Sequence, residues 1–412
     1  MDQKYLNKLL LIYGKPPFTA DIDNHVNDLC RRLEELHINE MAPKSYKRCG
    51  GKKLYYPFKE KCKSGKSFTY TKCIVNQMDL ECRCKLDWLT EHIERSYYKD
   101  CQKKTTFLRK CKIVRCIEKL LKSLEPTSFI FLTGSTITNL GDNSSDVDIC
   151  WVIPGHGVNN LELSTVTELN FIHEKLYEAE KNLIEMLSEK DVIETTSVIE
   201  SKVPLLKIKF KRRWYNVEVD ISVNNLPGAM NSKLLHYYSR YDIRYSQLVL
   251  YFKNFCKESG YKDAQNYYLN SYSISLMVLH FLQAVVDPPI LPNLQRIRPD
   301  IFSNYKLLWF PFYQDICLPP ITVNKMPISE LYIKFLKYFG RFDSLHCGIS
   351  IAKGCLLPRE LFAKNNKNYP LFIEEPFERE NTARSLKTDQ WNDIKRNMIH
   401  EVSVIIKESK KF

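Results

Sequence analysis

The 412-residue sequence has no long apolar run, no low-complexity tract and no internal repeat. Its longest nearly apolar segment, residues 274–286, is too short to cross a bilayer and contains His280. A second apolar run, at 9–13, is too short for a secretory signal and ends in a Gly-Lys-Pro-Pro turn. These absences argue against a membrane protein and a repeat protein. They predict a soluble protein of two or three domains.

The sequence also lacks paired Cys-x-x-Cys motifs, although it contains fourteen cysteines. Structural zinc sites usually draw their thiolates from such pairs. Without a secretory signal, the cysteines are expected to be reduced thiols. Five of them fall in or beside the basic segment described next, and only the last two are close together: Cys49, Cys62, Cys73, Cys82 and Cys84. A mixture of buried and free thiols is the expectation, and zinc binding is the less favoured alternative.

Positive charge is concentrated near the N-terminus. The formal net charge is +13, and residues 44–75 carry ten Lys/Arg against one acid, Glu60, which leaves +9 in that segment. Aromatic residues are interleaved with the charges, as in proteins that stack bases and follow phosphates. A polyanionic partner such as RNA is therefore one interpretation, and a solvated basic arm is the other. Before this arm, residues 21–36 form a short coiled-coil-like seam, which favours packing on the protein itself over a partner helix.

Segment 131–148 combines an apolar strand, a glycine-serine turn and two closely spaced acids. Gly134 lets a backbone approach phosphate closely, and Ser135 offers a hydroxyl and an N–H to phosphate oxygens. Because successive side chains of a strand point to opposite faces, Asp146 and Asp148 share one face. Two such carboxylates repel by roughly 4 kcal/mol at an effective dielectric of about 20, and a divalent cation removes that repulsion. The pattern predicts a metal and phosphate site, with solvated acids at a turn as the alternative.

Nucleotidyl transfer with two metal ions needs a further carboxylate. Residues 214–222 alternate as a strand does, and Asp220 has an apolar neighbour on each side. A lone Asp is disfavoured inside a strand, so this one calls for a functional explanation. Glu218 lies on the same face and is the competing candidate. We therefore expect Asp220 to complete the set.

The order of predicted elements indicates an α+β fold. A helix precedes a strand, a second strand, a helix and three more strands, which is typical of a sheet with helices on one face. Beyond residue 225 apolar residues recur at helical spacing, interrupted by a proline-rich passage at 288–319. Lys253 and Lys257 are neighbours on one of these helices. By helix physics alone they are a solvated pair.

These residues carry a resemblance to a known family. The glycine-serine turn, the paired aspartates and Asp220 resemble the three-part signature of the DNA polymerase beta nucleotidyltransferase superfamily. The stretches VEVDISVNN, NSYSISLMVLHFLQ, PPILPNLQ and IEEPFERENTAR are similar, in order and spacing, to the terminal RNA nucleotidyltransferases. Within these, the match is to the cytoplasmic poly(A) polymerases of the germline-development (GLD) type. The resemblance runs from residue 86 to the C-terminus, and residues 1–85 match no family.

The resemblance implies roles for individual residues. Asp146, Asp148 and Asp220 would bind two Mg²⁺ ions, for which Mn²⁺ can substitute, and Asp220 would also orient the RNA 3′ hydroxyl. The other expected contacts are with the nucleotide: Gly134, Ser135, Lys253, Lys257 and Ser271 for the phosphates, Asn231 for the ribose hydroxyl, Asn225 for the base or sugar, and Tyr272 for stacking on the base. Asn139 stands where the family has Gly, which is tolerable because Asn can adopt a left-handed backbone.

The resemblance also implies the architecture, with the active site in the cleft between a polymerase-beta-like sheet domain and a helical, poly(A)-polymerase-associated domain. The expected divisions are a helical, then basic and cysteine-rich extension at 1–85, helices leading into the core at 86–125, a catalytic domain at 126–224, a helical nucleotide-recognition domain at 225–385, and a C-terminal helix and tail at 386–412.

Base choice is expected in segment 377–382. Uridine-adding relatives carry a His just before the Asn of this motif, whereas this sequence reads Phe-Glu-Arg-Glu-Asn-Thr. This resembles the adenylating members and implies template-independent addition of AMP from ATP to RNA 3′ ends, with release of pyrophosphate. A terminal uridylyltransferase is the alternative of the same class, and a catalytically inactive RNA-binding scaffold is the alternative of another class.

The resemblance finally implies the surroundings of the enzyme. The expected partners are an RNA 3′ end, ATP and an RNA-binding protein, with no membrane. The expected compartment is the cytoplasm, with the nucleus left open.

Overall fold

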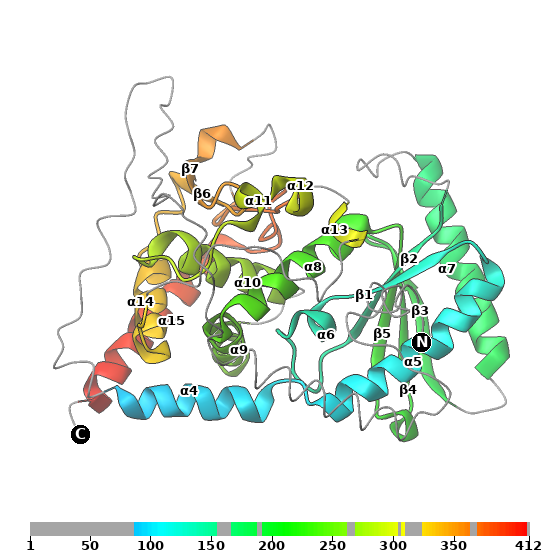
Figure 1. Ribbon diagram of the computed structural model, residues 1–412, viewed down its shortest axis with the longest axis horizontal. Coiled ribbons are helices and arrows are strands. Elements are labelled where there is room, and N and C mark those ends of the chain that lie inside the picture. Colours follow the sequence, from blue (N-terminus) through cyan, green and yellow to red (C-terminus); the bar gives the residue numbers. More distant parts are fainter. Residues whose placement is uncertain are drawn as a thin grey trace, which may run out of the picture.

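Two hydrophobic cores organise the chain in the computed structural model, which describes residues 86–154, 166–187, 192–261, 268–303, 306–309, 324–362 and 369–409. One core lies between a five-stranded sheet and its helices. The other lies within a mostly helical part, which is formed by the helix at 87–100 and by the chain from Leu226 onward. Figure 1 places the sheet on one side and the helical part on the other. The predictions for residues 1–85, including the basic segment and its cysteines, fall outside the described residues.

The five-stranded sheet has the strand order β1-β2-β5-β4-β3. Neighbouring strands are antiparallel except for β2 and β5, which run parallel. The strands are β1 (Phe129–Thr133), β2 (Val147–Val152), β3 (Ile193–Ile199), β4 (Leu205–Phe210) and β5 (Glu218–Val223). This order brings β2 and β5, which are far apart in sequence, to the middle of the sheet.

Alternation along the strands gives the sheet two different faces. One face packs in a core with helices α5 (Lys104–Leu124) and α7 (Val166–Leu187). Its strand residues include Ile130, Leu132, Val147, Ile149, Trp151, Val219 and Ile221. The intervening residues Phe131, Cys150 and Val152 belong instead to the helical core. The sheet is therefore covered by helices on one face and meets the second core through part of the other.

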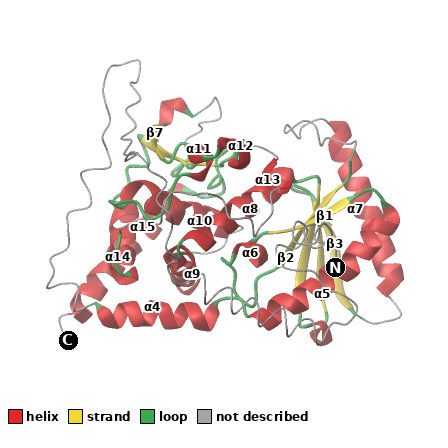
Figure 2. Ribbon diagram, viewed as in Figure 1, coloured by secondary structure: helices red, strands yellow, loops and turns green. Residues whose placement is uncertain are grey.

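The helical part is built on long helices, several of which bury residues on more than one side. Helix α10 buries every residue from Ser273 to His280, as expected of a helix at the centre of a core. Figure 2 shows these helices, in red, grouped beside the sheet. The longer members are α4 (Asp87–Asp100), α8 (Leu226–Tyr241), α9 (Ile243–Glu258), α10 (Ser271–His280), α14 (Ile328–Gly340) and α15 (Thr388–Ser409).

Shorter elements complete this part. They are the π-helical turn η4 (Phe281–Val285), α11 (Leu294–Ile297), α12 (Pro299–Phe302), α13 (Lys306–Trp309), β6 (Cys347–Ser350), β7 (Cys355–Pro358), η5 (Arg359–Leu361) and β8 (Ile373–Glu374). The three strands form a small sheet in the order β7-β6-β8. The sequence patterns did not predict this sheet, because strands of two to four residues are too short to show alternation.

Most predicted elements are confirmed, and two expectations need correction. The strand expected over 214–222 begins only at Glu218, since a 3₁₀ turn, η3 (Arg212–Trp214), is followed by positive φ angles at Tyr215 and Asn216. The expectation that helices cover one face holds for α5 and α7, but α8 also contacts β1 and β2 from the second core. Among the described helices, none is both long and apolar enough to cross a membrane.

Candidate active site

Three aspartates lie on the sheet face opposite α5 and α7. Asp148 on β2 and Asp220 on β5 are direct partners in the parallel pairing of these strands. Asp146 precedes β2 by one residue and is half-buried. The flanking apolar residues of β2 and β5 point the other way, into the sheet core. The structure thus brings together carboxylates that are more than seventy residues apart in sequence.

Each carboxylate of this group holds its proton more tightly than an isolated Asp. Burial, followed by the charges of Asp220 and Asp146, raises the pKa of Asp148 from 3.8 to about 7. Burial also raises the pKa values of Asp146 and Asp220, against the opposing effect of Lys207. The three ionised carboxylates therefore repel one another, and a cation bound between them would relieve this repulsion.

Asp220 is well suited to receive such a charge. Its Oδ1 is buried and has no hydrogen-bond donor among the described residues, and Lys207 Nζ lies 3.6 Å away. In the described ranges, no group of three or more His, Cys, Asp or Glu side chains, the aspartates included, is arranged to hold a metal ion by itself. Mg²⁺ is commonly held by one or two carboxylates together with substrate phosphates and waters, so the open arrangement fits this ion.

Glu218, the competing candidate, has a different environment. Its carboxylate lies 3.2 Å from Lys207 Nζ, and its position on β5 is paired with Lys209 of β4 rather than with β2. Asp220 instead faces Asp148 directly. The register of the sheet therefore favours Asp220 over Glu218 as the third carboxylate.

The glycine-serine turn lies directly over the aspartates. Gly134 has φ +68°, and its N–H donates to Ser232 Oγ of α8 at 2.8 Å. A four-residue helix, α6 (Ser135–Thr138), begins with the half-buried Ser135 and ends at Asn139, whose φ of 59° is left-handed. Asn139 thus adopts the backbone expected of the family's Gly. The turn places the Gly134 backbone beside the Asp148 carboxylate, while the Ser135 hydroxyl lies next to Gly141.

The predicted ribose and base contacts meet in a second cluster. Tyr272 donates its hydroxyl proton to Asn231 Oδ1, and Asn231 Nδ2 donates to Glu375 Oε1. Glu375 is buried, which raises its pKa, and it accepts the backbone N–H of Phe377 at 2.6 Å. We did not predict Glu375 from the sequence. Its only signal was its place within the IEEPFERENTAR stretch that carried the resemblance.

The remaining predicted residues have individual settings. Asn225 caps α8, accepting the Gly228 N–H at 3.1 Å. Lys253 is buried, and its Nζ donates to the Leu140 carbonyl at 2.8 Å, shortly after the glycine-serine turn and α6. Ser271 begins α10, and Lys257 is exposed one turn beyond Lys253. Within the described residues, no side-chain hydrogen bond joins Ser271 or Lys257 to the aspartates.

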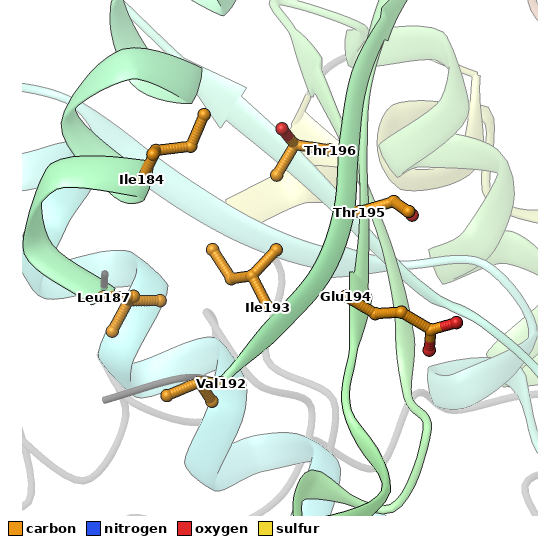
Figure 3. A pocket seen from close by; sticks show the side chains of 7 residues that line it. All are labelled: Ile184, Leu187, Val192, Ile193, Glu194, Thr195 and Thr196. Atoms are coloured by element: carbon orange, nitrogen blue, oxygen red, sulfur yellow. The ribbon is translucent and has the colours of Figure 1, made fainter. Parts of the chain in front are cut away.

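A separate hollow lies at the edge of the sheet. Its volume is about 250 Å³, and Figure 3 shows its lining from the end of α7 and the start of β3: Ile184, Leu187, Val192, Ile193, Glu194, Thr195 and Thr196. This lining includes none of the predicted site residues; it combines four aliphatic side chains with Glu194, Thr195 and Thr196. The aspartates therefore lie outside this hollow.

A sheet that presents a glycine-serine turn above aspartates on two neighbouring strands defines a nucleotidyltransferase of the polymerase-beta type. Two family models match the chain. Residues 89–240 match the central palm domain of "Poly(A) RNA polymerase, mitochondrial-like", and residues 327–381 match "Cid1 family poly A polymerase". The chain belongs to the GLD-type terminal nucleotidyltransferases.

Curated relatives carry the name poly(A) RNA polymerase. The gld-2 homolog A of Drosophila melanogaster is 31% identical over 324 residues, which cover 76% of this chain and 23% of that protein. GLD2 of Mus musculus is 33% identical over 300 residues, covering 72% of this chain and 60% of that protein. The chain therefore spans less than two thirds of the length of these relatives.

Solved structures agree with the fold. The structure of a GLD-2/RNP-8 complex matches with a TM-score of 0.64 and 27% identity, covering 79% of this chain and 98% of that one. The Cid1 poly(U) polymerase matches with a TM-score of 0.62 and 20% identity, covering 77% and 94%. At that identity, the second match concerns the fold alone.

Proposed function

We propose that this protein adds AMP from ATP to RNA 3′ ends without a template and releases pyrophosphate. The observation that carries the proposal is that Asp148 and Asp220 are direct neighbours on the paired strands β2 and β5. Asp146 lies beside them, and the Gly134 turn lies against Asp148. The curated relatives named poly(A) RNA polymerases support the same activity.

In this mechanism the protein mainly positions groups and places charge. Asp146, Asp148 and Asp220 would hold Mg²⁺, with Mn²⁺ as a substitute, and the bound ions would lower the charge on the phosphates and activate the attacking hydroxyl. Asp220 orients the RNA 3′ hydroxyl. The Gly134-Ser135 turn, with Lys253, Lys257 and Ser271, holds the triphosphate. Tyr272 stacks on the base, Asn231 contacts the ribose hydroxyl, and Asn225 contacts the base or the sugar.

The preference for ATP is proposed from the loop between β8 and α15. Asn381 is buried, and its Oδ1 accepts the N–H groups of Ile373 and Ala383, both at 3.0 Å. The residue before it is the exposed Glu380, which forms an ion pair with Lys202. Uridine-adding relatives have His at the equivalent place. Because this chain has no His there, the loop resembles that of the adenylating members, and we propose ATP rather than UTP as the substrate.

Primer extension with each of the four nucleoside triphosphates, with and without Mg²⁺, tests this function. We expect extension with ATP that stops when Mg²⁺ is chelated. A preference for UTP would establish the uridylyltransferase alternative in its place. No extension with any nucleotide, alone or with an RNA-binding partner, would favour the inactive scaffold.

A pair of substitutions on β5 tests the carboxylate assignment. Asp220→Asn should abolish extension, because it removes the charge facing Asp148, whereas Glu218→Gln should retain most of it. The two positions are two residues apart on one strand and one face, so the second variant controls for general damage. Full activity in Asp220→Asn would show that the assignment is wrong.

RNA affinity and partner binding are proposed separately from catalysis. By analogy with the structural relative in complex with RNP-8, we propose that an RNA-binding protein partner assists this protein. The proposed compartment is the cytoplasm, with the nucleus as the alternative. The basic segment at 44–75 would add affinity for RNA phosphates. Deleting residues 1–85 should weaken RNA binding and flatten its dependence on salt concentration. If the truncated protein binds RNA with the same affinity and the same salt dependence, the basic segment does not contribute to RNA binding.

A further inference from the structure

A buried lysine, Lys110, lies next to the glycine-serine turn and contacts Thr136 of α6. Lys110 belongs to α5 and is only 1% exposed. Its Nζ donates to Gln102 Oε1 at 2.7 Å and to Thr136 Oγ1 at 3.2 Å, so these two hydrogen-bond partners are neutral. A lysine in the interior normally pairs with an acid, because burial of the charge is costly. The placement of Lys110 therefore needs a reason beyond packing.

The hydrogen bonds continue from Lys110 to the first catalytic aspartate. Thr136 Oγ1 donates to the backbone carbonyl of Asp146 at 2.9 Å. Gln102 Nε2 donates to the Thr136 carbonyl at 3.0 Å, and the Gln102 N–H donates to the Gly141 carbonyl at 3.1 Å. The connection between α4 and α5 is thus joined to both sides of the turn that carries the site.

The electrostatic setting agrees with this geometry. Burial lowers the pKa of Lys110 to about 8, while Asp142, Asp146 and Asp148 each raise it. These acids are therefore near enough for their charges to act on the Lys110 ammonium group. Lys207 lies beside Asp220 and Glu218 from β4. The aspartates are thus flanked by a buried lysine from α5 and a half-exposed one from the sheet.

We propose that Lys110 is a positioning residue for nucleotidyl transfer. Through Thr136 it holds the backbone of Asp146 and the turn from Gly134 onward in the geometry that receives the metal and the triphosphate. Its charge also offsets part of the repulsion among the aspartates before substrate arrives. Lys110 contacts neither substrate nor metal in this role, and the role in catalysis rests on the proposed function.

Four substitutions, one of them a control, separate this role from an effect on stability alone. Lys110→Met keeps length and apolar volume but removes the charge and the donors. Thr136→Val removes the hydroxyl that joins Lys110 to Asp146, and Thr136→Ser restores it. Val114→Ala is the matched control, because Val114 is fully buried one turn further along the same helix and is no part of the hydrogen-bonded chain.

Under saturating Mg²⁺, we expect Lys110→Met and Thr136→Val to lower kcat by roughly 10- to 100-fold, with KM for ATP within about threefold of the parent. Thr136→Ser should retain most of the rate, and Val114→Ala should lose thermal stability but little kcat. The double variant should be little worse than either single variant, because both break one chain of contacts. Unchanged kcat in Lys110→Met, or an equal loss in Val114→Ala at the same fall in Tm, would overturn the proposal.

Hydrogen exchange measured by mass spectrometry gives a readout that does not depend on activity. In the metal-free full-length chain, Lys110→Met should speed amide exchange in peptides covering residues 134–146 by roughly tenfold or more. Peptides of α14 and α15 should be unchanged, and Val114→Ala should affect α5 instead. Unchanged exchange at 134–146 would refute the positioning role. A different outcome is that the parent protein fails to extend RNA with any of the four nucleotides and still shows this exchange pattern. In that case the proposed function fails, while the structural role of Lys110 stands.

Discussion

A Cβ atom on Gly134 would lie 1.8 Å from Oδ2 of Asp148. Any residue with a side chain at position 134 would therefore collide with the Asp148 carboxylate, and only glycine fits there. This contact explains why the turn can sit directly on the catalytic sheet face. It also means that the turn proposed to bind phosphate and the carboxylate proposed to bind metal are in direct contact.

Gly134→Ala should accordingly abolish activity, because the methyl group must displace the Asp148 carboxylate. We expect a fall in the extension rate of roughly 100-fold or more, since misplacing a reacting group by about an ångström costs that much. Gly260→Ala is a close control. Gly260 also has a positive φ, of 74°, but a Cβ there meets no atom within 4 Å. It should lose some stability and keep its activity. Equal activity in the two variants would contradict this explanation.

The raised pKa of Asp148 predicts a pH dependence of stability without metal. The folded protein binds this proton with a pKa of about 7, against 3.8 for an ordinary Asp, so it holds more protons than the unfolded chain between these values. The contribution to the free energy of unfolding is present below pH 4 and is lost as pH rises to 7, by up to about 4 kcal/mol.

Thermal melts in EDTA should therefore show Tm falling by several degrees as the pH rises from 5 to 8. Asp148→Asn should flatten this dependence and stabilise the metal-free protein at pH 8. Added Mg²⁺ should raise the Tm of the parent at pH 8 and leave that of Asp148→Asn nearly unchanged. The same pH slope in both proteins would mean that another group is responsible.

Tyr272 is expected to recognise the nucleotide with both its ring and its hydroxyl. Tyr272→Phe removes only the donor to Asn231 and should raise KM for ATP a few-fold. Tyr272→Leu removes the aromatic face and should raise it by roughly 10- to 100-fold, because base stacking contributes about 1–3 kcal/mol. Tyr177→Ala, at an exposed position on α7, is the control. If Tyr272→Leu kept the parent KM, stacking by this ring would be excluded.

Lys253 and Lys257 should respond differently to substitution, although both are expected at the triphosphate. Lys253→Met leaves the Leu140 carbonyl without its lysine donor, so it should lower stability by about 1–3 kcal/mol and also raise KM for ATP. Lys257→Ala should raise KM without changing Tm, because this side chain is exposed. Lys407→Ala, exposed near the end of α15, should change neither quantity. A Lys257 variant with an unchanged KM would remove that residue from the site.

Local sequence determined which residues could do the chemistry. Alternation along residues 146–152 predicted that Asp146 and Asp148 share one face, and the apolar neighbours of Asp220 marked it as an unusual strand residue. The positive φ values of Gly134 and Asn139 follow from residue types that tolerate such backbones. These features depend on a few neighbouring residues and need no knowledge of the fold. The resemblance added the nucleotide contacts, whose roles stay predictions.

Only the tertiary structure decided which residues meet. The parallel pairing of β2 with β5 sets Asp148 against Asp220, and a register shifted by one residue would have turned Asp220 to the other face. The contacts of Glu375 with Asn231 and of Lys110 with Thr136 join segments with no common local pattern. Strand register and buried hydrogen bonds are set by long-range packing, and no pattern within a short stretch of sequence contains them.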